Sequence, residues 1–157
     1  YDYTMGENFR YPANTIDYNT TDISNWAQII TATGAQSPTV SITNNAETYT
    51  TGDGMDVNMT TSGSGTAVDI YVVLQLPDGS FFNMGDLSFI TAATTSLMPF
   101  ISAHPLINAA YPVFSLSPLP TIPAGVYIWW AVMCPAGADA YNVSNWIGYD
   151  SAAFTFN

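Results

Sequence analysis

The sequence predicts an all-β protein, a two-sheet β-sandwich that follows an aromatic N-terminal extension. From Gln36 onward, short runs of alternating apolar and polar residues are separated by Gly, Pro, Asn and Asp, and no helical period persists for more than a few turns. Six or more such strands need two packed layers to bury their apolar faces, and 157 residues with 48% hydrophobic content suit one domain of this kind. We therefore divide the chain into an extension, residues 1–35, and a sandwich, residues 36–157.

The clearest strand unit is a hairpin at residues 67–84. Alternate aliphatic side chains from Val68 to Leu76 lie on one face, the sequence Pro-Asp-Gly supplies the turn, and Phe81 begins the return strand. Residues 92–112 contain three prolines and are predicted to be a long connection that packs against the sandwich and includes either a short helix or a strand crossing from one sheet to the other. The other strands are expected at residues 38–45, 55–60, 113–120, 124–137 and 145–157.

Residues 126–135, with the sequence VYIWWAVMCP, form a predicted strand with two apolar faces. A half-buried strand carries a polar residue at every second position, yet both alternating sets are apolar here. Either the chain's own residues 1–35 or 92–112 cover the second face, or a neighbouring subunit does. We expect the following side chains on this aromatic surface outside the core: Tyr71, Val73, Tyr127, Trp129 and Met133.

The N-terminal extension carries aromatic residues among polar ones. Disordered tails are depleted in aromatic residues, so we expect residues 1–35 to bind something. An extended segment can add a strand to the edge of another sheet while its alternate side chains fill pockets. The extension is therefore a candidate donor strand, in which Arg10 pairs with an acidic residue of the neighbouring subunit. Its expected anchors are Tyr3, Phe9, Tyr11 and Tyr18.

Charge narrows the classes of partner. The chain has 12 acidic residues, one Arg and no Lys, for a net charge of −11. Nucleic acids and anionic membrane surfaces are recognised through clustered Lys and Arg, so neither is an expected partner. No apolar run is long enough for a membrane span. Only 8% of the residues are charged, and a surface made soluble by Thr, Ser and Asn indicates an extracellular protein whose signal peptide has been removed.

The residue inventory does not favour catalysis. His104 is the one histidine and has no adjacent carboxylate, while the absence of Lys and of a Cys pair excludes Schiff-base and thiol redox chemistry. Cys134 lies within an apolar strand and is predicted to be a small buried hydrophobic residue. No cofactor is expected. Asp53 and Asp56 are a weak calcium candidate, because a Gly-Asp-Gly turn explains their spacing without an ion.

Three Asn-x-Ser/Thr sequons are candidate glycosylation sites. They lie at Asn19, Asn58 and Asn142. A chain rich in Thr and Asn also produces such triplets by chance.

Three motifs in order resemble an immunoglobulin-like domain that recurs near the C-termini of bacterial secreted and cell-surface proteins. They are TGDGMDVNMTTSGSGTAVDIYVVLQLPDGS, then LPTIPAGVYIWWAVMCPAGA, then WIGYDSAAFTF, and the resemblance covers about residues 40–157. It implies an immunoglobulin-like sandwich with a structural or adhesive role and no catalysis. The residues that match the family's recurring positions are read as turn or strand-boundary residues: Asp53, Asp69, Pro77, Asp78, Gly79, Pro123, Gly125, Asp150 and Phe154.

These features together predict a structural subunit that assembles with copies of itself into an extracellular filament or pilus-like fibre through its N-terminal segment. Subunits of charge −11 repel one another, so salt, divalent cations or mild acid should stabilise the assembly. The alternative is an adhesion or carbohydrate-binding module, in which Trp146 and Tyr149, beside Asn142 and Asn145, stack on the sugar rings of a surface glycan. A surface-layer component is a third interpretation.

Overall fold

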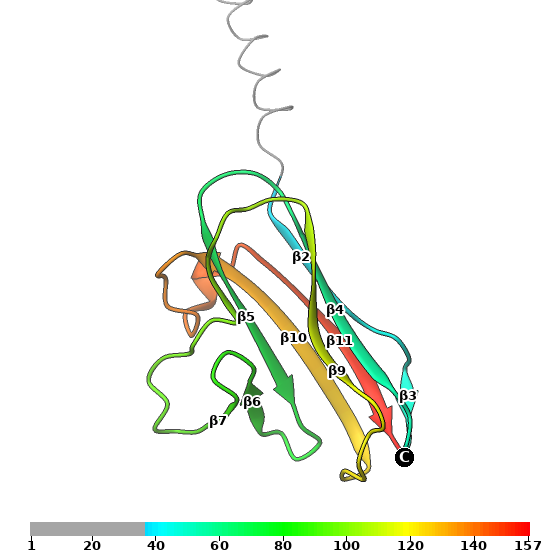
Figure 1. Cartoon of the computed structure of the whole chain (residues 1–157). Coiled ribbons are helices and arrows are strands. Elements are labelled where there is room, and N and C mark those ends of the chain that lie inside the picture. The colour runs from blue at the N-terminus through cyan, green and yellow to red at the C-terminus, as the bar shows by residue number, and fades with distance from the viewer. Residues whose placement is uncertain (1–36) are drawn as a thin grey trace, which may run out of the picture. The chain divides into compact units, whose positions relative to one another are not determined.

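Two β-sheets pack face to face in the computed structural model, which describes residues 37–157 (Figure 1). The small sheet contains, in order, β2 (Thr39–Asn44), β4 (Met55–Ser62) and β9 (Ala109–Leu116), all antiparallel. The large sheet contains, in order, β3 (Thr48–Tyr49), β11 (Gly148–Phe156), β10 (Gly125–Pro135), β5 (Val68–Gln75), β6 (Phe81–Asn83) and β7 (Ser88–Ile90), and β8 (Ile101–His104) also pairs with β5. A 3₁₀ turn, η2 (Val143–Asn145), precedes β11. The predicted immunoglobulin-like, all-β sandwich is confirmed.

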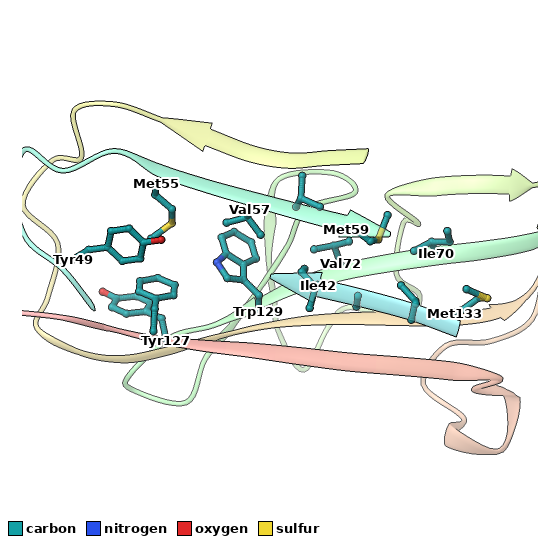
Figure 2. Close-up of a cluster of buried hydrophobic side chains, with 14 of the residues drawn as sticks. Ile42, Tyr49, Met55, Val57, Met59, Ile70, Val72, Tyr127, Trp129 and Met133 are labelled. Atoms are coloured by element: carbon teal, nitrogen blue, oxygen red, sulfur yellow. The ribbon is translucent and has the colours of Figure 1, made fainter. Parts of the chain in front are cut away.

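The core lies between the two sheets and is built from the alternating residues of their strands. In β4 every second side chain from Met55 to Thr61 is buried, which matches the period-2 pattern of the sequence. Figure 2 shows Val57 of β4 near Trp129 of β10, and both side chains belong to the buried core cluster. Tyr127 extends the core toward the other end of β10, where its ring stacks on Phe154 at a centroid distance of 5.0 Å.

Carboxylates hold strands and turns together at several of the motif positions. Asp150 accepts hydrogen bonds from the Ser41 hydroxyl and the Ile42 amide, both at 2.9 Å, and so joins β11 to β2 of the other sheet. In the Pro-Asp-Gly turn, Asp78 accepts from the Ser80 amide at 2.9 Å. The sequence interpretation of these residues as turn or strand-boundary positions is too narrow for Asp150, because it links the two sheets.

The Pro-Asp-Gly turn packs against Gly125 and leaves no room for a side chain at that position. Its φ is +146°, and a Cβ built there would lie 2.8 Å from Cβ of Pro77. Two motifs that lie 48 positions apart by residue number, at Pro77 and Gly125, are therefore in direct contact.

The stretch predicted as a long connection contains strands. β8 lies within residues 92–112 and pairs with β5 through Val68 and His104. β9 begins at Ala109 and ends at Leu116, earlier than the strand predicted at 113–120. Pro112 lies inside β9 beside an irregularity of the β4–β9 pairing, which weakens the local strand signal at the start of β9.

Candidate binding pocket on the outer face of the large sheet

The register between β5 and β10 decides which face of each strand is buried. Ile70 lies opposite Met133 and Leu74 lies opposite Trp129, and directly opposed side chains share a face of the sheet. Met133, Trp129 and Tyr127 therefore face the core together with the even-numbered aliphatic residues of β5. The prediction that these three residues form an outer surface with Tyr71 and Val73 is wrong, because Tyr71 and Val73 point to the opposite side.

The outer face of the large sheet carries the other alternating set. Tyr71 lies opposite Val132, and Val73 lies opposite Trp130. This face holds a cavity of about 400 Å³. The described residues that line it are mostly aromatic and aliphatic, and none of them is charged: Tyr71, Val73, Gln75, Phe81, Ile90, Leu97, Trp130, Val132, Ala140, Tyr141 and Trp146.

The polar groups of three lining aromatic side chains, Tyr71, Trp130 and Trp146, are bonded to the protein itself. The indole N–H of Trp130 donates to Oε1 of Gln75 at 3.1 Å, and that of Trp146 donates to the Ala140 carbonyl at 2.8 Å. The Tyr71 hydroxyl donates to the Ala138 carbonyl at 3.4 Å. Because these groups are already paired, the pocket offers ring faces and aliphatic surface to an occupant. It suits an uncharged apolar or aromatic group.

Segments of the chain's own loops form the walls and cover part of the outer face. Tyr71, Val132, Cys134 and Ala140 make a second buried cluster, and Leu97 and Trp146 pack against it. Leu97 belongs to residues 92–112. This stretch therefore covers part of the second apolar face of β10, as one of the sequence-based alternatives proposed. Elsewhere on this face, among the described residues, Val126 and Tyr149 are exposed.

Asp69 fixes the position of these walls. Its buried carboxylate accepts a hydrogen bond from the Ala103 amide at 2.8 Å and another from the Gly137 amide at 2.7 Å. The first bond holds β8, and the second holds the start of the loop that carries Ala140 and Trp146. The Asp69 position of the family motif therefore shapes the pocket, although no atom of Asp69 lines it.

A second depression, of about 490 Å³, lies between β11 on one side and β2 with the residues that follow it, Ala46 and Glu47, on the other. Its lining mixes Thr, Asn and Glu side chains with apolar ones, and the Asn44 amide donates across it to the Ala153 carbonyl at 3.0 Å. The aromatic pocket is the better candidate for a binding site, because its described lining residues are nearly all apolar or aromatic and none is charged.

Comparisons with known proteins yield only distant structural similarity. No protein-family model matches the chain, and no curated protein matches it. The CARDB domain of the PF1109 protein from Pyrococcus furiosus, solved in complex with di-metal ions, is similar with a TM-score of 0.43 at 12% identity, over 78% of this chain and 89% of that one.

Two further solved structures are similar at comparable identity. Spo0M, a sporulation control protein from Bacillus subtilis, has a TM-score of 0.38 at 12% identity, over 77% of this chain and 49% of that one. BslA, described as a bacterial hydrophobin, has a TM-score of 0.28 at 13% identity, over 78% of this chain and 97% of that one. Values of this size say nothing about a shared function.

Cys134 is a buried free thiol, as the sequence predicted. Burial first, and then the negative charges of Asp69 and Asp139, raises the pKa of this thiol from 9.0 to about 11. We expect an aromatic disulfide reagent at pH 8 to leave the folded chain unmodified and to react fully after denaturation, because little thiolate forms and access is blocked. Cys134→Ala is the blank for this assay, and rapid labelling of the folded chain would contradict the assignment.

The raised pKa of Cys134 also makes the stability of the folded chain depend on pH. The folded state holds the Cys134 proton more tightly than the unfolded state does, so the folded chain loses stability as the pH rises from about 9 toward about 11.

His104 and the two calcium candidates, Asp53 and Asp56, make structural contacts. His104 is buried against Tyr111, whose hydroxyl lies 3.3 Å from Nε2. The Asp53 carboxylate accepts from the Thr50 amide at 2.7 Å, and Asp56 accepts from the Ser115 hydroxyl at 2.6 Å. Within residues 37–157, no group of three or more His, Cys, Asp or Glu side chains could hold a metal ion. The calcium candidate gains no support from this arrangement.

The remaining sequence candidates lie on the surface or outside the described residues. Asn58 is exposed on β4, and Asn142 is exposed but its side chain accepts from the Ser144 amide at 3.0 Å. In the described part of the chain no helix is long and apolar enough to cross a bilayer. Outside residues 37–157 lie the sequon at Asn19 and all of the predicted donor residues: Tyr3, Phe9, Arg10, Tyr11 and Tyr18.

Pocket residues that sequence reasoning missed include Trp130, Phe81 and Tyr141. One signal for them was present. Gln75 is polar and shares an alternation with Tyr71 and Val73, which marks that face of β5 as the outer one. Assigning Trp130 to the same face requires the β5–β10 register, which the sequence does not specify.

Proposed function

We propose that the protein is a non-catalytic structural subunit that assembles with copies of itself into an extracellular filament. The observation that supports this proposal is the open apolar area on the outer face of the large sheet. Around the pocket, the exposed fraction is 64% for Tyr149, 45% for Tyr141 and 37% for Phe81. Val126 continues the same face along β10 and is also exposed. An apolar area of this kind is typical of surfaces that bind another protein.

The composition supports assembly outside a cell. Outward-facing positions of β2 and β4 in the small sheet carry Thr, Ser, Asn and Asp side chains, so these two strands present a polar surface with few charges. One polar side and one apolar side suit a subunit that buries the second against a neighbour. If the donor segment and the receiving face are different surfaces, the contact is heterologous and propagates into a fibre.

The test compares the full chain with a chain that lacks residues 1–20, by sedimentation velocity and negative-stain electron microscopy. We expect fibres or large species from the full chain and monomers from the shortened one. Higher salt or Ca²⁺ should favour assembly of the full chain, because each subunit carries a net charge of −11. Monodisperse monomers from both proteins across salt and pH would contradict the proposal.

A glycan-binding module is the second candidate, and one observation favours it. The rings of Trp146 and Tyr149 lie 5.7 Å apart at an interplanar angle of 56°, and Tyr149 is exposed. Aromatic rings of this kind can stack on sugars, but sugar hydroxyls also need polar partners, and the pocket supplies few that are free. Oligosaccharide binding that disappears in Tyr149→Ala would favour this candidate over self-assembly.

A further inference from the structure

We propose that the aromatic pocket of one subunit receives Phe9 and Tyr11 from the N-terminal segment of a second copy of the chain. This inference rests on the proposed function and adds to it the receiving site and the donor side chains. The pocket is bounded by Trp130, Trp146 and Tyr141, among others.

The pocket is preformed and selective for apolar groups. The indole N–H groups of Trp130 and Trp146 are bonded to Gln75 and to the Ala140 carbonyl, so the rings that form the floor and one wall are held in place. A volume of about 400 Å³ lies at the small end of the range for ligand pockets, and it suits one or two large side chains. A charged ligand would find no opposite charge among the described lining residues, and the polar groups of Tyr71, Trp130 and Trp146 are already hydrogen-bonded.

The segment of the chain that fits this chemistry lies outside the described residues. Residues 1–20 contain Phe9 and Tyr11 two positions apart, and in an extended segment such residues point to the same side. They lie roughly 7 Å apart in that conformation, which matches two neighbouring side chains entering one pocket. Ring burial against Trp and Tyr is a strong anchor in protein interfaces.

Charge complementarity selects the same part of the segment. Residues 37–157 contain no Lys or Arg, and Arg10 is the one cationic residue of the whole chain. Asp139 is exposed and directly precedes Ala140 and Tyr141 of the pocket wall. Burial, followed by the charge of Asp139, raises the pKa of Tyr141, so the carboxylate lies within electrostatic reach of the pocket. Arg10 between the two aromatic residues would meet this negative rim.

The first experiment measures binding of a fluorescently labelled peptide of residues 1–20 to a chain that lacks those residues, by anisotropy. Residues 37–157 contain a complete core and form their own compact unit, so the shortened chain should fold. We expect saturable binding, and about tenfold or greater weakening when Phe9 and Tyr11 of the peptide are both replaced by Ala. Replacing Arg10 by Gln should weaken binding severalfold at low salt and less at high salt.

The pocket side is tested with variants at its exposed rim, where folding is least at risk. Tyr141→Ala and Phe81→Ala should each weaken binding of the peptide by about tenfold. The matched control is Val143→Ala, because Val143 is 66% exposed on the same loop and does not line the pocket. The affinity of Val143→Ala for the peptide should stay within about twofold of that of the parent chain. Equal affinities of the rim variants and the control would overturn the pocket as the receiving site.

Experiments on the full chain separate this inference from the proposed function. If full-length Tyr141→Ala and Phe81→Ala form fibres as well as the parent chain does, the pocket is not the receiving site, and the proposal of self-assembly is unaffected. A full chain that stays monomeric, yet blocks its own pocket against added peptide, would show that the segment folds back on its own subunit. That result would overturn both the second copy as donor and the proposed filament.

Discussion

Replacing Trp129 with Ala should lower the free energy of unfolding by about 3–5 kcal/mol. Trp129 is only 2% exposed, and its ring lies 5.7 Å from that of Phe114 across the core. Removal of this side chain leaves a large cavity between the two sheets, because neither sheet can collapse to fill it. Urea denaturation followed by far-ultraviolet circular dichroism measures the loss. Far-ultraviolet signal is preferable to fluorescence here because the substitution removes a tryptophan.

The adjacent tryptophan supplies the matched control. Trp130 is half-buried on the outer face, so Trp130→Ala should lower the free energy of unfolding less than Trp129→Ala does. Because Trp130 lines the pocket, its substitution should weaken binding of the N-terminal peptide. Trp129→Phe should cost less than Trp129→Ala, because the Phe ring refills part of the space that Ala leaves empty. Both substitutions remove the buried indole N–H, which has no hydrogen-bond partner among the described residues. The assignment of faces fails if Trp130→Ala destabilises the fold more than Trp129→Ala.

Asp69→Ala should destabilise the fold by about 2–5 kcal/mol and weaken peptide binding as well. The substitution removes the acceptor of the Ala103 and Gly137 amides, and a part-buried hydrogen bond to a charged group contributes about 1.5–3 kcal/mol. The loop that begins at Gly137 carries one wall of the pocket, so its release should also loosen the binding site. Asp69→Asn keeps the size and one acceptor oxygen, and it should lie between the parent and Asp69→Ala.

Hydrogen exchange resolves this effect at individual amides. In Asp69→Ala the amides of Ala103 and Gly137 should exchange faster than in the parent, while the amides paired between β10 and β11 should lose protection only through global unfolding. An Asp69→Ala chain within 0.5 kcal/mol of the parent, with unchanged exchange at both amides, would be inconsistent with the anchoring role.

Local sequence patterns were sufficient for much of the fold. The Pro-Asp-Gly turn and the alternating strand before it predicted the hairpin of β5 and β6, because turn chemistry and the period-2 pattern act within a few residues. In β4, polar and apolar residues alternate strictly, so the sequence also identified the buried face. The start of β9 was missed because Pro112 interrupts the strand signal at the edge of the small sheet. β8 has only four residues, and the sequence left a strand or a short helix open for this stretch.

The sequence by itself determined the all-β class, the position of the main hairpin and a surface with very few charges, because each depends on composition or on neighbouring residues. Only the tertiary structure decided that Trp129 lies in the core while Trp130 lies in the pocket. Both alternating sets of β10 are apolar, so hydrophobicity alone cannot orient the strand. Pairing with β5 sets that orientation, and a shift of one residue would exchange the two faces. The pocket also needs walls from loops that are distant in sequence, held together by Asp69, and no local pattern encodes that meeting.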